Sequence, residues 1–202
     1  MDRPNCTAST PPRGSAPIQR PPIAWIDGIG GVAIAAADRM TIGRNANLPI
    51  RGNLRSVAGE LIRRGEDWFW RGHVDDATDQ NAAEILLGEG DPIPIGGGVD
   101  LTIHRPGALT ATRRLDLRSP HRWAGGVDSV LLVATVATIG PTPSDSIRAC
   151  NLDQTHYLCT AGSMITLRCD AESATTAFDP PAGGGDPIRA GELTLAMRPW
   201  DV

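Results

Sequence analysis

Short stretches of alternating hydrophobic and polar residues occur along much of the chain, with the two-residue period of strands. Residues 99–104 alternate in this way, as does much of 109–117. Residues 60–64 and 68–70 flank Gly65-Glu66-Asp67, which predicts a hairpin. Glycine or proline recurs about every 8–12 residues, which is the spacing of turns in a sandwich. No window has a convincing helical period, so the pattern predicts an all-β fold.

The chain also repeats itself over a long distance. Three motifs recur in the same order, 93 to 97 residues apart: 41–43 as 138–140, 90–93 as 185–188, and 105–106 as 198–199. A period of this length fits a duplicated domain rather than a solenoid. The sequence therefore predicts a flexible tail at 1–20 and two tandem antiparallel β-sandwiches, at 21–107 and 108–202.

Composition excludes some classes of partner. The chain has 202 residues, of which 41% are hydrophobic and 21% charged, as in an ordinary soluble globular protein. A formal net charge of −4 provides no global attraction to nucleic acid or to an anionic membrane, so neither is expected. No lysine occurs, so every contact from a permanent side-chain cation uses the planar guanidinium group of arginine.

The N-terminal segment and the cysteines indicate a cytoplasmic location. Residues 1–20 contain no apolar run that could serve as a signal peptide, and no stretch is long enough to span a bilayer. The four cysteines include no Cys-x-x-Cys pair, so reduced thiols are expected. Cys150, His156, Cys159 and Cys169 lack the paired spacing of a zinc site. We therefore expect neither a metal nor a cofactor, and we expect Cys159 and Cys169 to fill core positions.

The order of motifs in the first half resembles the forkhead-associated (FHA) domain family. Ile42-Gly43-Arg44 matches the Ile-Gly-Arg that follows an early strand in that family, and residues 67–70 match its aromatic strand. Ser56 stands where the family has a Ser-Arg-x-His element, and Asn81 falls near its Asn-Gly loop. Residues 90–93, Gly-Asp-Pro-Ile, match the closing Gly-Asp-x-Ile step.

The resemblance covers about residues 22–106 and, more faintly, 109–200, and it implies phosphothreonine recognition. Arg44 and Ser56 would contact the phosphate group, and Asn81 would hold the peptide backbone. A phosphate group carries strong acceptor oxygens and a charge of about −1.5 to −2, which suits an arginine fork and a hydroxyl group. The implied partner is a phosphorylated protein, either a Ser/Thr protein kinase or the substrate of one.

The sequence also departs from the family. The histidine that braces the binding loops is Gly59 here, the arginine after the serine is Val57, and the glycine of Asn-Gly is Ala82. In the second half Pro141 replaces the arginine and removes a backbone donor with it. Gln154 stands roughly where the serine is expected, so we expect this half to be a degenerate copy without a phosphate site.

Two functions remain as alternatives, and both are non-catalytic. The first is phosphopeptide recognition at a basic loop end formed by Arg44, Arg51 and Arg55. The second is a scaffold that has lost both phosphate sites and binds an unmodified protein through an exposed face or edge strand. An apolar surface patch, with Arg44 tied into an ion pair, would favour the scaffold. An enzyme is not expected, because Ser56 and His73 are accompanied by no nucleophile elbow or oxyanion-hole motif.

Overall fold

The computed structural model describes residues 18–73, 83–107, 110–161, 164–169, 172–178 and 186–201. Within them the chain forms three β-sheets and one short 3-10 turn, η1 (Ala124–Gly126). The first sheet has seven strands in the spatial order β17 (Ile188–Ala190), β18 (Leu193–Arg198), β1 (Ile23–Ile26), β2 (Gly30–Ala35), β11 (Ser129–Leu132), β9 (Arg113–Leu117), β8 (Leu101–His104). The second has six, in the order β10 (Arg122–Trp123), β4 (Leu48–Arg51), β3 (Arg39–Gly43), β5 (Gly59–Arg64), β6 (Asp67–Gly72), β7 (Glu84–Leu87). The third has five, in the order β13 (Ile147–Arg148), β12 (Val136–Gly140), β14 (His156–Ala161), β15 (Met164–Cys169), β16 (Glu172–Phe178). The prediction of an all-β fold is confirmed.

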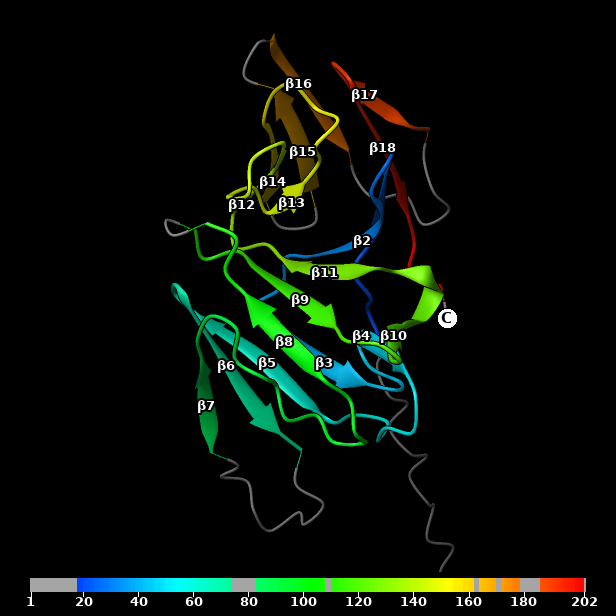
Figure 1. Cartoon of the computed structure of the whole chain (residues 1–202), viewed down its shortest axis with the longest axis vertical. Coiled ribbons are helices and arrows are strands. Elements are labelled where there is room, and N and C mark those ends of the chain that lie inside the picture. The colour runs from blue at the N-terminus through cyan, green and yellow to red at the C-terminus, as the bar shows by residue number, and fades with distance from the viewer. Residues whose placement is uncertain are drawn as a thin grey trace, which may run out of the picture.

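The seven-stranded sheet lies between the other two, as Figure 1 shows. One hydrophobic core fills the space between it and the six-stranded sheet, and a second fills the space between it and the five-stranded sheet. Successive side chains on a strand point to opposite faces, so β2 and β11 contribute to both cores. Ala33 and Val130 belong to the first core, and Val32 and Leu131 belong to the second. Burial on both faces explains the apolar run that begins at Val130.

Strands from the two halves of the chain are interleaved in the seven-stranded sheet. β8, the last strand of the first half, pairs with β9 of the second half, and β18 at the end of the second half pairs with β1. At the centre of the sheet β2 and β11 pair in parallel, with Val32 beside Ser129. Both of these strands are covered by the six-stranded sheet on one face and by the five-stranded sheet on the other. The six-stranded sheet therefore packs on Leu115 and Val130 of the second half, and the five-stranded sheet packs on Ala24 and Val32 of the first.

The long-range repeat has a structural counterpart in both outer sheets. In the first half, the Thr41 backbone N–H donates to the side-chain oxygen of Asn47, and the Asn47 N–H donates to Thr41 Oγ1. In the second half, Thr138 and Ser146 exchange the same pair of hydrogen bonds, at 3.2 and 3.0 Å. β3 pairs in parallel with β4, and β12 in parallel with β13. The two halves thus have the same local topology, while their division into separate domains at 107 stays a prediction.

The predicted hairpin at 60–70 is present as β5 and β6, which pair from Gly59 to Arg64 through a tight turn. Arg113, on β9, ties this turn to the second half of the chain. Its guanidinium group donates to the carbonyl oxygens of Thr110 at 2.8 Å and Glu66 at 3.4 Å, and the residue is only 7% exposed. Burial, followed by the nearby Arg105, lowers the pKa of Arg113 below its ordinary value. The predicted tail lies outside the described residues up to position 17.

Candidate functional site

The β3–β4 loop (44–47) and the β4–β5 loop (52–58) lie side by side at one end of the six-stranded sheet; together they are called the loop end below. The backbone N–H of Arg44 donates to the carbonyl oxygen of Arg55 at 2.9 Å, and that of Asn45 donates to Ser56 at 2.9 Å. A third hydrogen bond, from Ala58 N–H to the carbonyl oxygen of Ile42, closes the ladder at 2.7 Å. The pairing of β3 with β5 is thereby extended beyond the strands and holds the two loops together.

Gly43 permits this close approach. A Cβ atom at this position would lie 2.8 Å from the Cα of Val57 and would collide with the carbonyl oxygen of Ser56. Real Cβ contacts are not this short, so any other residue would move the loops apart. The glycine in Ile42-Gly43-Arg44 is therefore required by backbone packing.

The structure brings together three of the four predicted site residues. Arg44 and Ser56 are exposed on adjacent loops. Within the described residues, no hydrogen bond or ion pair reaches the guanidinium group of Arg44. Arg55 lies between them in the ladder and donates from Nη1 to the carbonyl oxygen of His73 at 3.2 Å. Asn81, the fourth, lies outside the described residues.

One position is a glycine in the first half and a histidine in the second half. Gly59 pairs with Ile42 across β3 and β5, and His156 pairs with Ile139 across β12 and β14. Ile42 and Ile139 are equivalent in the repeat, so His156 occupies in the second half the position that Gly59 occupies in the first. The histidine that the family resemblance leads one to expect is therefore present, but in the half without the arginine.

The difference between Gly59 and His156 goes with a difference in side-chain size on the neighbouring strand. Trp70 on β6 is equivalent to Leu167 on β15, because they face Leu61 and Leu158 respectively. A Cβ atom at position 59 would collide with the Trp70 ring and with the carbonyl oxygen of Arg71, so the tryptophan and the adjoining backbone together leave no room for a histidine. The smaller Leu167 leaves this space free, and the equivalent histidine, His156, is fully buried there with its Nε2 donating to the Ala190 carbonyl at 2.9 Å.

The second half closes its corresponding loop with a carboxylate of its own. Asp145, which is 6% exposed, accepts hydrogen bonds from the backbone N–H and Oγ1 of Thr142, at 2.8 and 2.7 Å. Thr155 Oγ1 donates to the same carboxylate at 3.4 Å. A buried negative charge disfavours a second anion, and Pro141 supplies no cation. This geometry supports the expectation that the second half has no phosphate site.

Sequence reasoning did not identify the places of three residues of the second half. His156 is 97 residues after Gly59, the same separation as between the threonines of the repeat, so its equivalence was visible in the spacing. Strand register also places Asp153, rather than Gln154, at the position equivalent to Ser56. The role of Asp145 could not be predicted from the repeat. The β12–β13 loop that contains it is two residues longer than the β3–β4 loop, so Asp145 has no equivalent in the first half.

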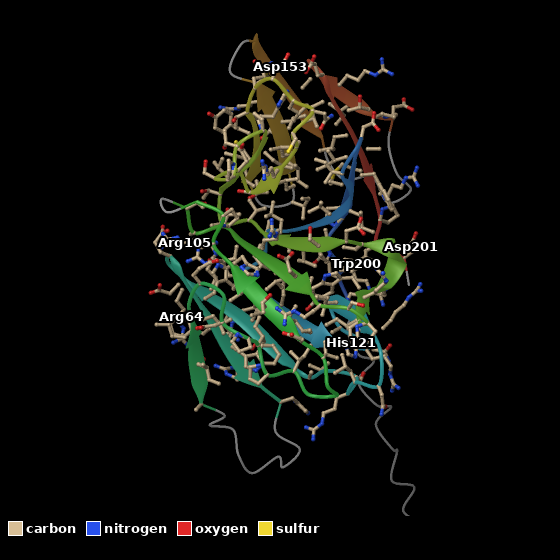
Figure 2. The ribbon with its side chains drawn as sticks, in the orientation of Figure 1. Arg64, Arg105, His121, Asp153, Trp200 and Asp201 are labelled. Carbon is tan, nitrogen blue, oxygen red and sulfur yellow. The ribbon has the colours of Figure 1, made fainter. Side chains whose placement is uncertain are left out.

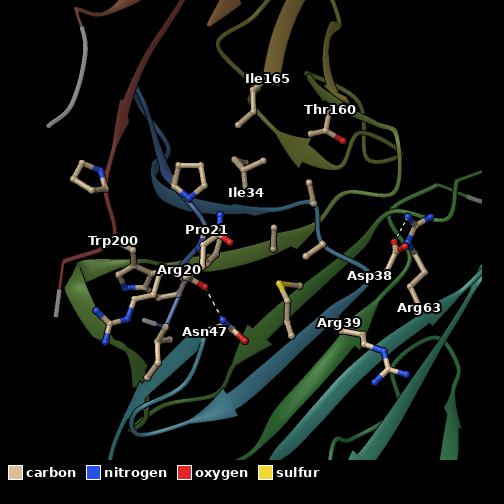
Figure 3. A pocket seen from close by; sticks show the side chains of 18 of the residues that line it. Arg20, Pro21, Ile34, Asp38, Arg39, Asn47, Arg63, Thr160, Ile165 and Trp200 are labelled. Atoms are coloured by element: carbon tan, nitrogen blue, oxygen red, sulfur yellow. Dashed lines mark hydrogen bonds and ion pairs between the residues drawn. The ribbon is translucent and has the colours of Figure 1, made fainter. Parts of the chain in front are cut away.

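Other candidate sites lie apart from the loop end or lack a metal-binding arrangement. Within the described ranges, no group of three or more His, Cys, Asp or Glu side chains could hold a metal ion. Cys169 is buried as expected, whereas Cys159 is half-buried. A groove of about 960 Å³ is lined by residues that include Ile34, Ile165 and Trp200, as Figure 3 shows, and neither Arg44 nor Ser56 lines it.

The chain was compared with protein-family models, with curated proteins and with solved structures. No family model, curated protein or solved structure matches the chain. No helix among the described residues is both long enough and apolar enough to cross a membrane. The chemistry of the site therefore rests on its geometry: the exposed guanidinium group of Arg44, which has no partner among the described residues, and the exposed hydroxyl group of Ser56 lie on loops held together by backbone hydrogen bonds.

Proposed function

We propose that the protein recognises phosphorylated peptides, with phosphothreonine bound at the loop end. Arg44 supplies a guanidinium fork and Ser56 supplies a hydroxyl donor, and both residue types form strong, directional hydrogen bonds to phosphate oxygens. Arg55 precedes Ser56 in the chain, and its carbonyl oxygen accepts the backbone N–H of Arg44. Asn81 is proposed to hold the peptide backbone on the basis of the family resemblance alone.

The observation that carries the proposal is the backbone ladder that joins Arg44 to Arg55 and Asn45 to Ser56. Loops fixed in this way lose little conformational entropy when a ligand binds, which preserves affinity. Arg44 has no carboxylate partner within the described residues, so a phosphate group need not displace one. This arrangement favours the first of the two functions expected from the sequence.

The proposal is tested by titrating a degenerate phosphothreonine peptide pool and its unphosphorylated twin against the intact protein and an Arg44→Ala variant. A charge-assisted hydrogen bond contributes about 1.5–3 kcal/mol, so the variant is expected to bind about tenfold to a hundredfold more weakly. The matched control is Arg168→Ala, which removes an exposed arginine from β15 in the second half. Equal binding of the two pools would refute phosphate recognition.

A second candidate function is supported by β7, the outermost strand of the six-stranded sheet. Two large apolar side chains on it, Ile85 and Leu86, are 50% and 56% exposed. An edge strand with exposed apolar residues can add an extended segment of another protein to its sheet. If the protein is a scaffold of this kind, Leu86→Lys is expected to abolish partner capture, whereas Arg44→Ala leaves it unchanged.

A further inference from the structure

Two arginines face each other across the junction between the two halves of the chain. β10, a two-residue strand of the second half, pairs with β4 of the first, which places Arg122 directly opposite Arg51 and Trp123 opposite Ile50. Trp123 and Ile50 are 2% and 1% exposed and belong to the core, so the alternation of side chains points both arginines to the outer face of the sheet. Both arginines are exposed.

This arrangement is unfavourable unless an anion lies nearby. Directly opposite residues of an antiparallel pair have Cβ atoms about 4.5–5.5 Å apart, and like charges at this distance repel each other. Within the described residues, no hydrogen bond or ion pair reaches the side chain of Arg51 or Arg122. None of the described carboxylates therefore neutralises the pair or relieves the repulsion.

Arginines elsewhere on the six-stranded sheet are neutralised. Arg71 forms ion pairs with both Glu60 and Glu84, and Arg64 pairs with Glu84 at 2.8 Å. Two further pairs, of Arg39 with Glu60 and of Arg63 with Asp38, complete the set. Among the described residues, Arg51 and Arg122 at the β4–β10 edge and Arg44 on the adjoining loop thus differ from these arginines in having no carboxylate contact.

The arginine pair lies beside the loop end. Strand register places Pro49 next to Gly43, so Arg51 is two residues further along β4, a distance of about 7 Å in an extended strand. His121, labelled in Figure 2, lies against the start of the β4–β5 loop, because a Cβ atom at Gly52 would be 3.6 Å from its ring. An extended peptide advances by a similar distance in two or three residues.

We propose that Arg51 and Arg122 form a second anion subsite, which binds an acidic group two or three residues from the phosphothreonine of the same peptide. The inference rests on the proposed function, because the first anion is the phosphate group at Arg44 and Ser56. The second anion is a carboxylate or a further phosphate group, both of which accept hydrogen bonds from paired guanidinium groups. One arginine comes from each half, so the second half contributes to recognition although its own loop is closed by Asp145.

The experiment measures peptide binding by fluorescence anisotropy with four peptide pools. One pool carries phosphothreonine with neutral flanking residues, a second adds aspartate at the second and third positions on either side, a third places phosphoserine there, and a fourth is the aspartate pool without phosphate. Each is titrated against the wild type and the variants Arg122→Gln, Arg51→Gln and Arg44→Ala. Arg64→Gln is the matched control, because Arg64 is an arginine of the same sheet that already has a carboxylate partner.

The wild type is expected to prefer the aspartate or phosphoserine pool over the neutral phosphothreonine pool by about threefold to tenfold. Arg122→Gln and Arg51→Gln are each expected to abolish this preference and to keep or raise the Tm, because a repulsion is removed. Arg122→Gln is also expected to retain binding of the neutral phosphothreonine pool, because Arg122 lies outside the loop end. The ratio between the two flanked pools identifies whether a carboxylate or a phosphate group is preferred.

Two outcomes separate failure of this inference from failure of the proposed function. If phosphothreonine binding requires Arg44 but the flanked and neutral pools bind equally, the subsite is refuted and the proposed function stands. If no pool shows dependence on phosphate, both are refuted. A preference for the flanked pools that persists unchanged in Arg51→Gln and Arg122→Gln also overturns the subsite.

Discussion

At the scale of single residues, a missing methyl group at Gly43 allows two loops to share backbone hydrogen bonds. The carbonyl oxygen of Ser56 occupies the space where a Cβ atom would lie. Local sequence identifies Gly43 as part of a motif, but it does not show which backbone atoms the residue approaches. Arg44 and Ser56 are twelve positions apart in the chain, and only the ladder between their loops makes them neighbours.

Gly43→Ala is expected to separate the loops and weaken phosphopeptide binding by at least about tenfold. An inserted methyl group in a close-packed site costs about 1–3 kcal/mol, and here it also opens the hydrogen bonds that hold Arg44 beside Ser56. Thermal unfolding and peptide titration together check this expectation. Gly72→Ala is the control, because a Cβ atom there meets nothing closer than Trp70 Nε1 at 3.7 Å. Unchanged binding by Gly43→Ala would show that the ladder does not position the site.

At the scale of strands, the two halves have different residues at two equivalent, neighbouring core positions. Gly59 and Trp70 on β5 and β6 correspond to His156 and Leu167 on β14 and β15. The first half thus has glycine opposite a strand that carries tryptophan, and the second half has histidine opposite a strand that carries leucine.

Gly59→His is expected to destabilise the protein by more than about 3 kcal/mol, because the new side chain collides with Trp70 and with the neighbouring backbone. Trp70→Leu alone is expected to cost about 2–5 kcal/mol through the cavity that it leaves. The double variant reproduces the arrangement of the second half and is expected to be more stable than either single variant. Urea unfolding of all four proteins measures the coupling, and additive effects would contradict a link between the two positions.

At the scale of the whole molecule, each hydrophobic core is built from strands of both halves. The six-stranded sheet packs on β9 and β11 of the second half, and the five-stranded sheet packs on β1 and β2 of the first. Arg113 and the β4–β10 pairing add further contacts between the halves. The buried area of each core therefore depends on strands that lie about 90 residues away in the sequence.

Residues 18–107 and 108–201, produced separately, are each expected to lack a cooperative unfolding transition, because each exposes an apolar face of its outer sheet. Mixing the two fragments is expected to restore the native near-ultraviolet circular dichroism and a single unfolding transition. Size-exclusion chromatography distinguishes a restored heterodimer from swapped homodimers of one fragment, which the repeat also permits. Two fragments that fold alone as monomers would show that the halves are independent domains.

Local patterns in the chain were sufficient to predict the all-β fold and the hairpin at 60–70, and the family resemblance singled out Arg44 and Ser56, which the structure places on loops. Alternation of side chains and turn residues acts over a few positions, so these features are readable without a structure. The interleaving of the halves, the pairing of Arg51 with Arg122 and the place of His156 depend on which distant strands pair. That choice is made by long-range packing, since a parallel pairing of β2 with β11 buries both of their faces at once. Tertiary structure alone therefore placed a residue of the second half beside the candidate site of the first.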